Sequence, residues 1–180
     1  MNAIKHFKTI TNHKLLVMKY CFKIGLYKQG ILHDLSKYSW IEFKAGIKYY
    51  KGIESPNGIQ KKVEGVSTAW LHHKGRNKHH FEYWIDYGVN PNDGLQGMKM
   101  PKNYVVEMFI DRMSASMNYQ KKKYTDKSAL EYYEARKQYY LLHEDTRILL
   151  ELLLKKLANE GEDKTLKYIK NVVLKDDFLV

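Results

Sequence analysis

Histidines and aspartates are the residues of this chain whose types and spacing could do chemistry. In GILHDLSKYS, residues 30–39, His33 and Asp34 stand side by side, and Lys37 follows three residues later. One explanation is that Asp34 caps the next helix by accepting backbone N–H bonds. The other is a metal site, because transition metals bind imidazole and carboxylate ligands. The doublet alone leaves both explanations open.

His13 and Asp111 each lie on an apolar helix face. His13 falls in a stripe of apolar residues spaced three or four apart, which predicts a helix over about 10–25. Asp111 lies inside YVVEMFIDRMSASM, where a carboxylate is costly unless a cation or hydrogen-bond donors compensate it. Arg112 faces another side of that helix, so the partner must come from another element. A hydrogen-bonded core histidine and a lysine salt bridge are the ordinary alternatives.

Two histidine pairs lie in AWLHHKGRNKHHFEYW. His73 continues the valine–tryptophan face of a helix predicted over about 60–74, whereas His72 is rotated by about 100° toward solvent or the domain edge. In the second pair, His80 aligns with the aromatic residues that follow, although His79 has a similar alignment. Solvated histidines at a helix junction are the ordinary alternative for two of these four residues.

Helices are predicted almost throughout, because no segment alternates with period two for long enough to form a sheet. Residues 54–58 are expected to be a turn and residues 86–100 a long loop. Ser128 and Glu131 match a capping box that opens a helix to about residue 159. We expect one all-α domain over 1–180, a bundle of about six to eight helices. It comprises a metal-site core at about 10–118, C-terminal helices at about 128–176, and a last helix over 164–174 capped by Asp163.

The composition is that of an ordinary globular chain, with 44% hydrophobic and 28% charged residues. No apolar run approaches the roughly 20 residues that span a bilayer, and no signal segment is visible. No membrane contact is therefore expected. The single cysteine, Cys21, excludes an internal disulfide, so a cytoplasmic location is expected. The net charge of +11 favours an anionic partner. Only residues 120–124 form a compact basic run, which makes nucleic acid the less favoured partner.

A single metal site would explain why histidines and carboxylates occupy these otherwise apolar positions. Imidazoles and carboxylates from several helices, converging in an apolar interior, form a transition-metal site. Asp34 can bridge two ions through its two oxygens, and two ions about 3.5–4 Å apart clamp a phosphoryl group. Lys37 lies one turn beyond Asp34, where its ammonium suits an anionic substrate.

The ordered set of residues resembles the HD-domain superfamily. Its pattern is a histidine on a first helix, a His-Asp doublet, further histidines and an aspartate on a late helix. The segment HDLSK is similar to the H-D-x-x-K version of binuclear members, which include HD-GYP cyclic-dinucleotide phosphodiesterases and inositol oxygenases. The chain also looks like a small uncharacterised family of bacterial and phage HD-like proteins. The resemblance covers about residues 10–118, and the GYP signature is absent.

The resemblance implies a ligand set and two catalytic residues. It implies a first ion held by His13, His33, Asp34 and Asp111, and a second held by Asp34, His73 and His80. It also implies that Asp34 and Lys37 are catalytic, with Lys37 contacting the substrate and a water activated by the ions as the nucleophile. The expected cofactor is one or two divalent ions among Mn, Fe, Co, Ni, Zn and Mg.

The leading hypothesis is a metal-dependent phosphohydrolase that acts on a small phosphate ester or nucleotide. Arg76 and Lys78, between the histidine pairs, are candidate phosphate contacts, with exposed loop charges as the alternative. Two other classes stay open. One is a di-iron oxygenase of the HD type, and the other is a non-catalytic basic module that binds nucleic acid. The leucine-rich segment at 141–161 is expected to pack across the domain, with a homodimer interface as the alternative, and His143 there to be a surface or packing residue.

Overall fold

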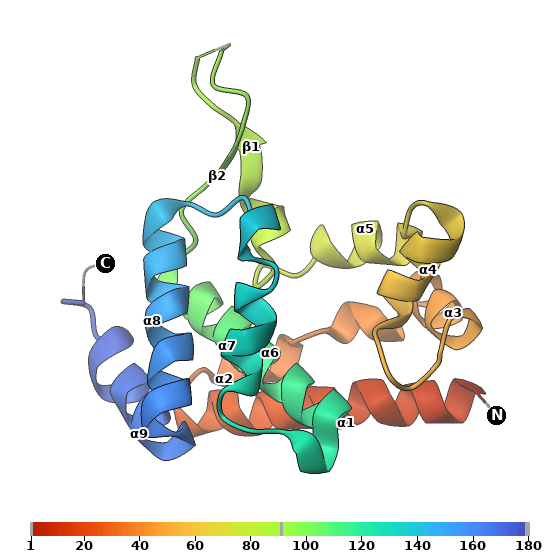
Figure 1. The fold of residues 1–180 in the computed structure, drawn as a ribbon, viewed down its shortest axis with the longest axis horizontal. Helices are drawn as coiled ribbons and strands as arrows, with labels where there is room; N and C mark the ends of the chain where they lie inside the picture. The colour runs from red at the N-terminus through yellow and green to blue at the C-terminus, as the bar shows by residue number, and fades with distance from the viewer. Residues whose placement is uncertain (1, 91, 179–180) are drawn as a thin grey trace.

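The computed structural model describes residues 2–90 and 92–178. Residue 91 of the predicted loop and the extreme ends of the predicted domain, residues 1 and 179–180, lie outside the described residues. The helix α1 (Asn2–Lys23) runs along one side of the molecule, and α2 (Tyr27–Leu32), α3 (Trp40–Lys48) and α6 (Lys102–Gln120) pack against it (Figure 1). One group of helices lies over its N-terminal half and a second group over its C-terminal half, with the α6 helix crossing α1.

The described residues contain nine α-helices, which confirms the predicted all-α class. The count exceeds the expected six to eight because two helices that the sequence predicts as continuous are broken. Short 3₁₀ turns η1 (Leu35–Tyr38) and η2 (Phe81–Trp84) connect some of the helices, and a π-helical turn (Ile169–Val173) extends the last one. The remaining helices are α2 (Tyr27–Leu32), α3 (Trp40–Lys48), α4 (Pro56–Glu64), α5 (Thr68–Lys74), α6 (Lys102–Gln120), α7 (Ser128–Glu134), α8 (Glu144–Glu160) and α9 (Glu162–Tyr168).

The single helix predicted over 60–74 is wrong. Gly65 ends α4 in the left-handed region at φ 77°, and Ser67 begins α5 by accepting a hydrogen bond from the backbone N–H of Trp70. The valine–tryptophan face is also wrong, because Val63 and Val66 are exposed. The predicted turn at 54–58 is largely the first turn of α4, which suits a proline at its first position.

The continuous helix predicted from residue 128 is interrupted before α8, and the predicted capping box is wrong. The Ser128 hydroxyl accepts from the backbone N–H of Thr125 and donates to Gln120, so it stabilises the preceding turn instead. His143, predicted as a surface or packing residue, caps α8 by accepting from the backbone N–H of Asp145. Gly161 ends α8 as predicted, and α9 begins directly after this glycine, without an Asp163 cap.

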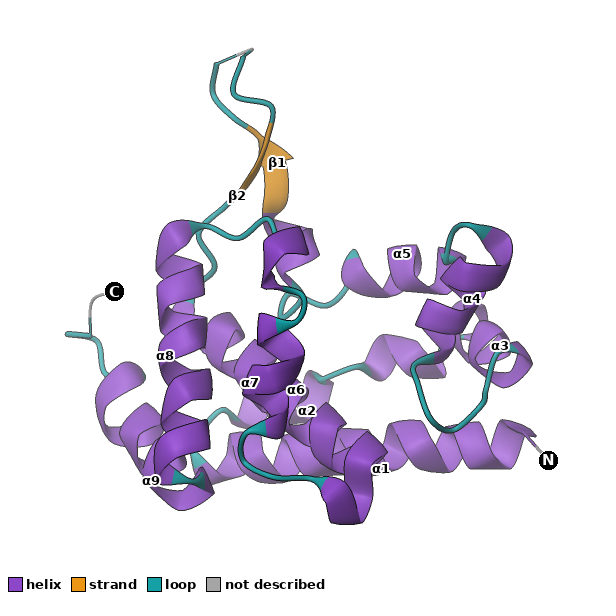
Figure 2. Cartoon of the chain, in the orientation of Figure 1, coloured by secondary structure: helices purple, strands orange, loops and turns teal. Residues whose placement is uncertain are grey.

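A two-stranded ribbon replaces part of the predicted loop over 86–100. The strands β1 (Ile85–Tyr87) and β2 (Leu95–Gly97) pair antiparallel, with Asp86 opposite Gln96. The ribbon projects from the helical body (Figure 2). Each strand has only three residues, which is too short for a period-two pattern to be visible in the sequence.

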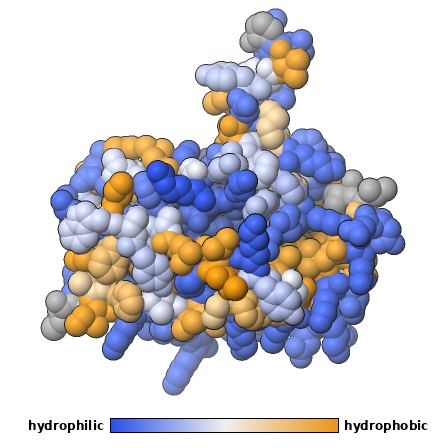
Figure 3. All heavy atoms as spheres, turned by 180° about the vertical axis from the view of Figure 1, so that it is seen from behind, coloured by the Kyte–Doolittle hydropathy of each residue, from blue (hydrophilic) through white to orange (hydrophobic). Residues whose placement is uncertain are grey.

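The apolar core lies between α1 and the helices α6 to α9. Four leucines of α8 are fully buried there, which confirms that this segment packs within the chain. The surface seen from behind alternates hydrophilic and hydrophobic patches (Figure 3). None of the described helices is both long and apolar enough to cross a membrane. The four leucines are Leu150, Leu153, Leu154 and Leu157.

The packing of α2 against α1 places the His-Asp doublet. A Cβ atom on Gly30 would lie 3.0 Å from the Cβ of Cys21, so any larger residue would push the two helices apart by a few tenths of an ångström. The Lys14 ammonium then donates to the carbonyl oxygens of Ile31 (2.6 Å) and His33 (2.9 Å) at the end of α2. The doublet is thereby fixed beside the middle of α1, where His13 lies.

The burial of α8 generates a stability prediction. Leu153→Ala removes a fully buried side chain and should lower the free energy of unfolding by about 2–5 kcal/mol. Its neighbour Leu152 is 40% exposed, so Leu152→Ala should change stability by no more than about 0.5 kcal/mol. Urea unfolding of both variants measures the difference. Equal losses, or losses that depend on protein concentration, would contradict this packing.

Candidate metal centre

The carboxylate of Asp34 is the centre of a buried group of histidines. The residue is 2% exposed. Its Oδ2 atom lies 3.3 Å from His33 Nε2 and 2.5 Å from Lys37 Nζ. Its Oδ1 atom lies 3.2 Å from His73 Nε2 and 3.5 Å from His79 Nε2. The two oxygens of one side chain therefore face two different sets of imidazoles.

The helix-cap explanation of the doublet is wrong. Asp34 precedes the 3₁₀ turn η1, but its side chain makes no capping hydrogen bond. Its backbone adopts the left-handed region at φ 54°, which costs an L-residue on the order of 1–2 kcal/mol. Such strain persists only where the surroundings impose it, and it is common at functional sites.

The structure brings together the first predicted set of four residues. His13 Nε2 lies 2.9 Å from Asp111 Oδ1, 3.4 Å from His33 Nε2 and 3.6 Å from Asp34 Oδ2. Asp111 Oδ1 also lies 3.6 Å from His33 Nε2. No lysine forms the salt bridge with Asp111 that was the ordinary alternative, among the described residues. One donor atom from each of the four residues lies within 4.8 Å of the others.

A second set of four residues shares Asp34. It contains His73 and His80, as predicted, and also His79, so both members of the second histidine pair contribute. The donor atoms again lie within 4.8 Å of one another. The sequence could not choose between the two residues of the pair, because they precede η2 in an irregular segment where helical periodicity does not apply.

The donor spacing fits a bound transition ion. At a bond length of about 2.1 Å, a tetrahedral or octahedral ion separates its ligand atoms by about 3.0–3.4 Å, close to the distances around Asp34. Asp34 Oδ2 is paired with the Lys37 ammonium, but Asp34 Oδ1 and the Nε2 atoms of His79 and His80 are buried without a hydrogen bond to any described residue. Buried polar atoms are rarely left so. The residues therefore fit a divalent ion at each set.

Two buried glutamates that the sequence analysis missed hold the outer nitrogens of the histidines. Glu107 Oε1 lies 2.9 Å from His33 Nδ1 and 3.2 Å from His79 Nδ1. Glu42 Oε2 lies 2.8 Å from His73 Nδ1. A carboxylate in this place accepts the Nδ1–H bond and leaves Nε2 free to bind a metal. Glu107 lies one helical turn before Asp111, and this i, i+4 spacing was the one sequence signal for it.

Electrostatics keep the carboxylates ionised. Burial acts to raise the pKa of Asp34, but the charges of His33, Lys37 and His73 outweigh burial and hold it well below its usual value. Burial acts to lower the pKa of His33, yet the charge of Asp34 and the hydrogen bonds that the ring donates to carboxylates raise it well above its usual value. Burial and the neighbouring histidines lower the pKa of His80 well below its usual value, so its nitrogen is available to a metal.

Of the three predicted substrate contacts, Lys37, Arg76 and Lys78, only Lys37 contacts the histidine cluster. Lys37 lies at the cluster, and 27% of its side chain is exposed, so it reaches both Asp34 and solvent. Arg76 is exposed and donates to the backbone carbonyl of His72. Lys78 is exposed, with its ammonium 5.7 Å from the ring centre of Tyr83. The described contacts of Arg76 and Lys78 thus lie outside the metal-ligand sets.

His72, unlike His73, belongs to neither ligand set, as predicted. Its side chain nevertheless contacts Glu42 and does not point freely into solvent. Its Nδ1 atom lies 2.7 Å from Glu42 Oε1, and 14% of its side chain is exposed. Ser36 and Asn77 complete the surroundings of His73, because the Asn77 amide donates to the Ser36 hydroxyl and to the carbonyl of His73. The end of α5 is thereby attached to η1.

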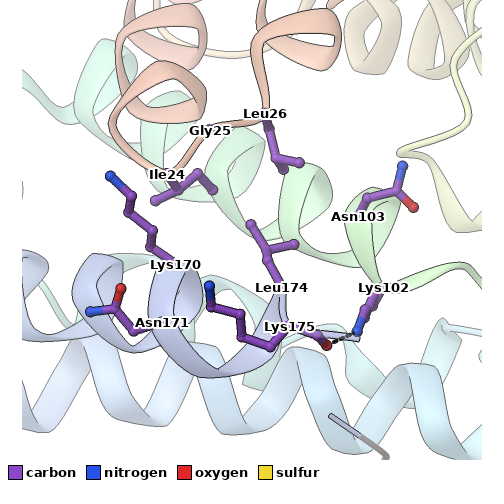
Figure 4. A pocket seen from close by; sticks show the side chains of 9 residues that line it. All are labelled: Ile24, Gly25, Leu26, Lys102, Asn103, Lys170, Asn171, Leu174 and Lys175. Carbon is purple, nitrogen blue, oxygen red and sulfur yellow. Dashed lines mark hydrogen bonds between the residues drawn. The ribbon is translucent and has the colours of Figure 1, made fainter. Parts of the chain in front are cut away.

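A cavity of about 490 Å³ lies elsewhere, where the turn after α1 meets the start of α6 and residues 170–175 at the π-helical turn (Figure 4). Lys102, Lys170 and Lys175 line it, and the Lys102 ammonium is held by the backbone carbonyl of Lys175. No residue of the two metal-ligand sets lines this cavity. The candidate centre is therefore the histidine cluster.

Comparison with known proteins identifies a family to which the chain is similar. A family model described as "Family of unknown function (DUF5662)" matches residues 2–156. No curated protein and no solved structure matches the chain. The matched range includes every residue of the two metal-ligand sets and both outer glutamates.

The geometry predicts that a divalent ion stabilises the protein through His73 and not through His72. Saturating Mn²⁺ or Zn²⁺ at about 100 times the dissociation constant adds about 2.7 kcal/mol, which raises the melting temperature by roughly 5–10 °C at this size. His73→Gln should reduce this shift, whereas His72→Gln should preserve it. Thermal unfolding of chelator-treated protein, with and without the ion, measures both. Equal shifts in the two variants would contradict the assignment.

Proposed function

We propose that this protein, which belongs to the DUF5662 family, is a metal-dependent phosphohydrolase of the HD-domain type that acts on a small phosphate ester or nucleotide. The observation that carries the proposal is the shared carboxylate of Asp34. Each of its oxygens faces a separate set of imidazoles, which is the arrangement that a binuclear centre requires.

The ligands of the two ions follow from the two sets. His13, His33, Asp34 and Asp111 would hold the first ion, and Asp34, His73, His79 and His80 the second. When bound, two such ions supply Lewis acidity toward a phosphoryl oxygen and an activated water. Ligand sets rich in imidazole favour transition metals over Mg²⁺.

Lys37 is suited to bind the substrate. The Asp34 carboxylate raises the pKa of Lys37 against the effect of burial, so the ammonium stays charged. Its partial exposure places this charge between the buried ligands and solvent, where an anionic group arriving at the ions meets it. The net charge of +11 attracts the same class of ligand over longer distances.

A di-iron oxygenase is the second candidate, and the five imidazoles of the two sets favour it, because nitrogen ligands suit redox-active iron. The two activities differ in what they consume. Iron that co-purifies with the protein, together with oxygen uptake in the presence of a polyol or phosphonate, would support the oxygenase. Phosphate release under anaerobic conditions with Mn²⁺ would support the hydrolase.

Activity provides the test of the proposal. A panel of phosphate monoesters and nucleotides, assayed with Mn²⁺, Co²⁺, Fe²⁺ or Mg²⁺, should release phosphate with the wild-type protein. Asp34→Asn should abolish the release, because the bridging charge is lost. Lys37→Met should lower kcat/KM by about 10- to 150-fold, which corresponds to the about 1.5–3 kcal/mol of a charged hydrogen bond.

Lys28 provides the matched control, because it is an exposed lysine of α2 outside the cluster. Lys28→Met should leave kcat/KM unchanged, so a general loss of positive charge cannot account for the effect at Lys37. Activity that persists in Asp34→Asn would overturn the proposal.

A further inference from the structure

One carboxylate oxygen, Oε1 of Glu107, contacts the outer nitrogen of one histidine in each of the two ligand sets. Glu107 Oε1 lies within hydrogen-bond distance of His33 Nδ1, which belongs to the first set, and of His79 Nδ1, which belongs to the second. The two rings lie side by side, with centroids 4.4 Å apart. Glu107 is 4% exposed, so water does not compete for this oxygen.

The contact with Glu107 determines which nitrogen of each of the two rings carries the proton. A neutral histidine that binds a metal through Nε2 must carry its proton on Nδ1, and the partner of Nδ1 selects that tautomer. Glu107 Oε1 lies 2.9 Å from His33 Nδ1 and 3.2 Å from His79 Nδ1, so each outer nitrogen faces the same acceptor oxygen. An ionised carboxylate only accepts hydrogen bonds, so it favours Nδ1–H on both rings at once.

Glu42 offers a contrast within the same centre. Its Oε2 atom lies 2.8 Å from His73 Nδ1, and its Oε1 atom 2.7 Å from His72 Nδ1. His72 belongs to neither set. Glu42 therefore supports a ligand of the second set alone, with a burial similar to that of Glu107.

We propose that Glu107 is a positioning residue shared by both ion sites, so that the two sites gain or lose affinity together through this one side chain. The inference rests on the two-ion centre of the proposed function. Replacing an outer-sphere partner of a metal-binding histidine lowers metal affinity by about 10- to 100-fold. Because Glu107 serves a histidine in each set, its loss should act on both ions, whereas the loss of Glu42 should act on one.

The experiment is a titration of metal-stripped, folded protein with Mn²⁺ or Co²⁺, followed by calorimetry. Wild-type protein should bind two ions per chain. Glu107→Met keeps a similar length but has no acceptor oxygen, and both dissociation constants should rise by about 10- to 100-fold. Glu107→Gln retains one acceptor oxygen and should recover part of the loss. Glu42→Met should raise one dissociation constant only.

A second measurement separates positioning from a general effect on folding. Nitrogen-15 NMR of the metal-free protein, recorded at a pH above the raised pKa of His33 so that the ring is neutral, reports the tautomer of each histidine. In Glu107→Met the signals of His33 and His79 should shift away from the Nδ1–H form, and in Glu42→Met the signal of His73 should shift instead. Unchanged tautomers in Glu107→Met would overturn the inference even if the affinities fall.

The outcomes distinguish the inference from the function on which it rests. Two ions in the wild type, with only one or neither constant changed by Glu107→Met, would overturn the shared role and leave the binuclear centre intact. One ion or none in the wild type would overturn the binuclear centre, and with it the inference.

Discussion

The buried carboxylate of Asp34 is the constraint on which the rest of the centre depends. A charged side chain withdrawn from water is strongly destabilising unless partners compensate it. Here the partners are the Lys37 ammonium on one side and imidazoles from separate elements on both. The chain adopts a left-handed backbone conformation at this residue, a region that aspartate tolerates better than most other L-residues.

The fold serves this carboxylate by bringing distant segments to it. The middle of α1 contributes His13, the end of α5 contributes His73, and α6 contributes Asp111 together with the outer Glu107. The apolar core between α1 and α6 to α9 fixes two of these elements with respect to each other. The outer glutamates then set the ring orientations that packing alone would leave free. The proposed metal centre thus has buried acids in two layers, one among the candidate metal ligands and one behind the histidines.

The sequence predicted the parts of this arrangement that depend on helical periodicity. His13 and Asp111 interrupt apolar stripes of long helices, and both lie at the cluster. Prediction failed where the backbone leaves the helix. The break at Gly65 invalidated the valine face used for His73, although the residue is buried, and the irregular segment before η2 hid the role of His79. Glu42 and Glu107 were missed because a glutamate on a helix is ordinary in sequence, and its burial is a tertiary property.

The central claim is that the two oxygens of Asp34 face two ion positions. The direct measurement is anomalous diffraction from crystals grown with Mn²⁺, with data collected on both sides of the manganese absorption edge. A binuclear centre should give two peaks about 3.5–4 Å apart, one on each side of the Asp34 carboxylate. A single peak, or density at another place such as the lysine-lined cavity, would contradict it.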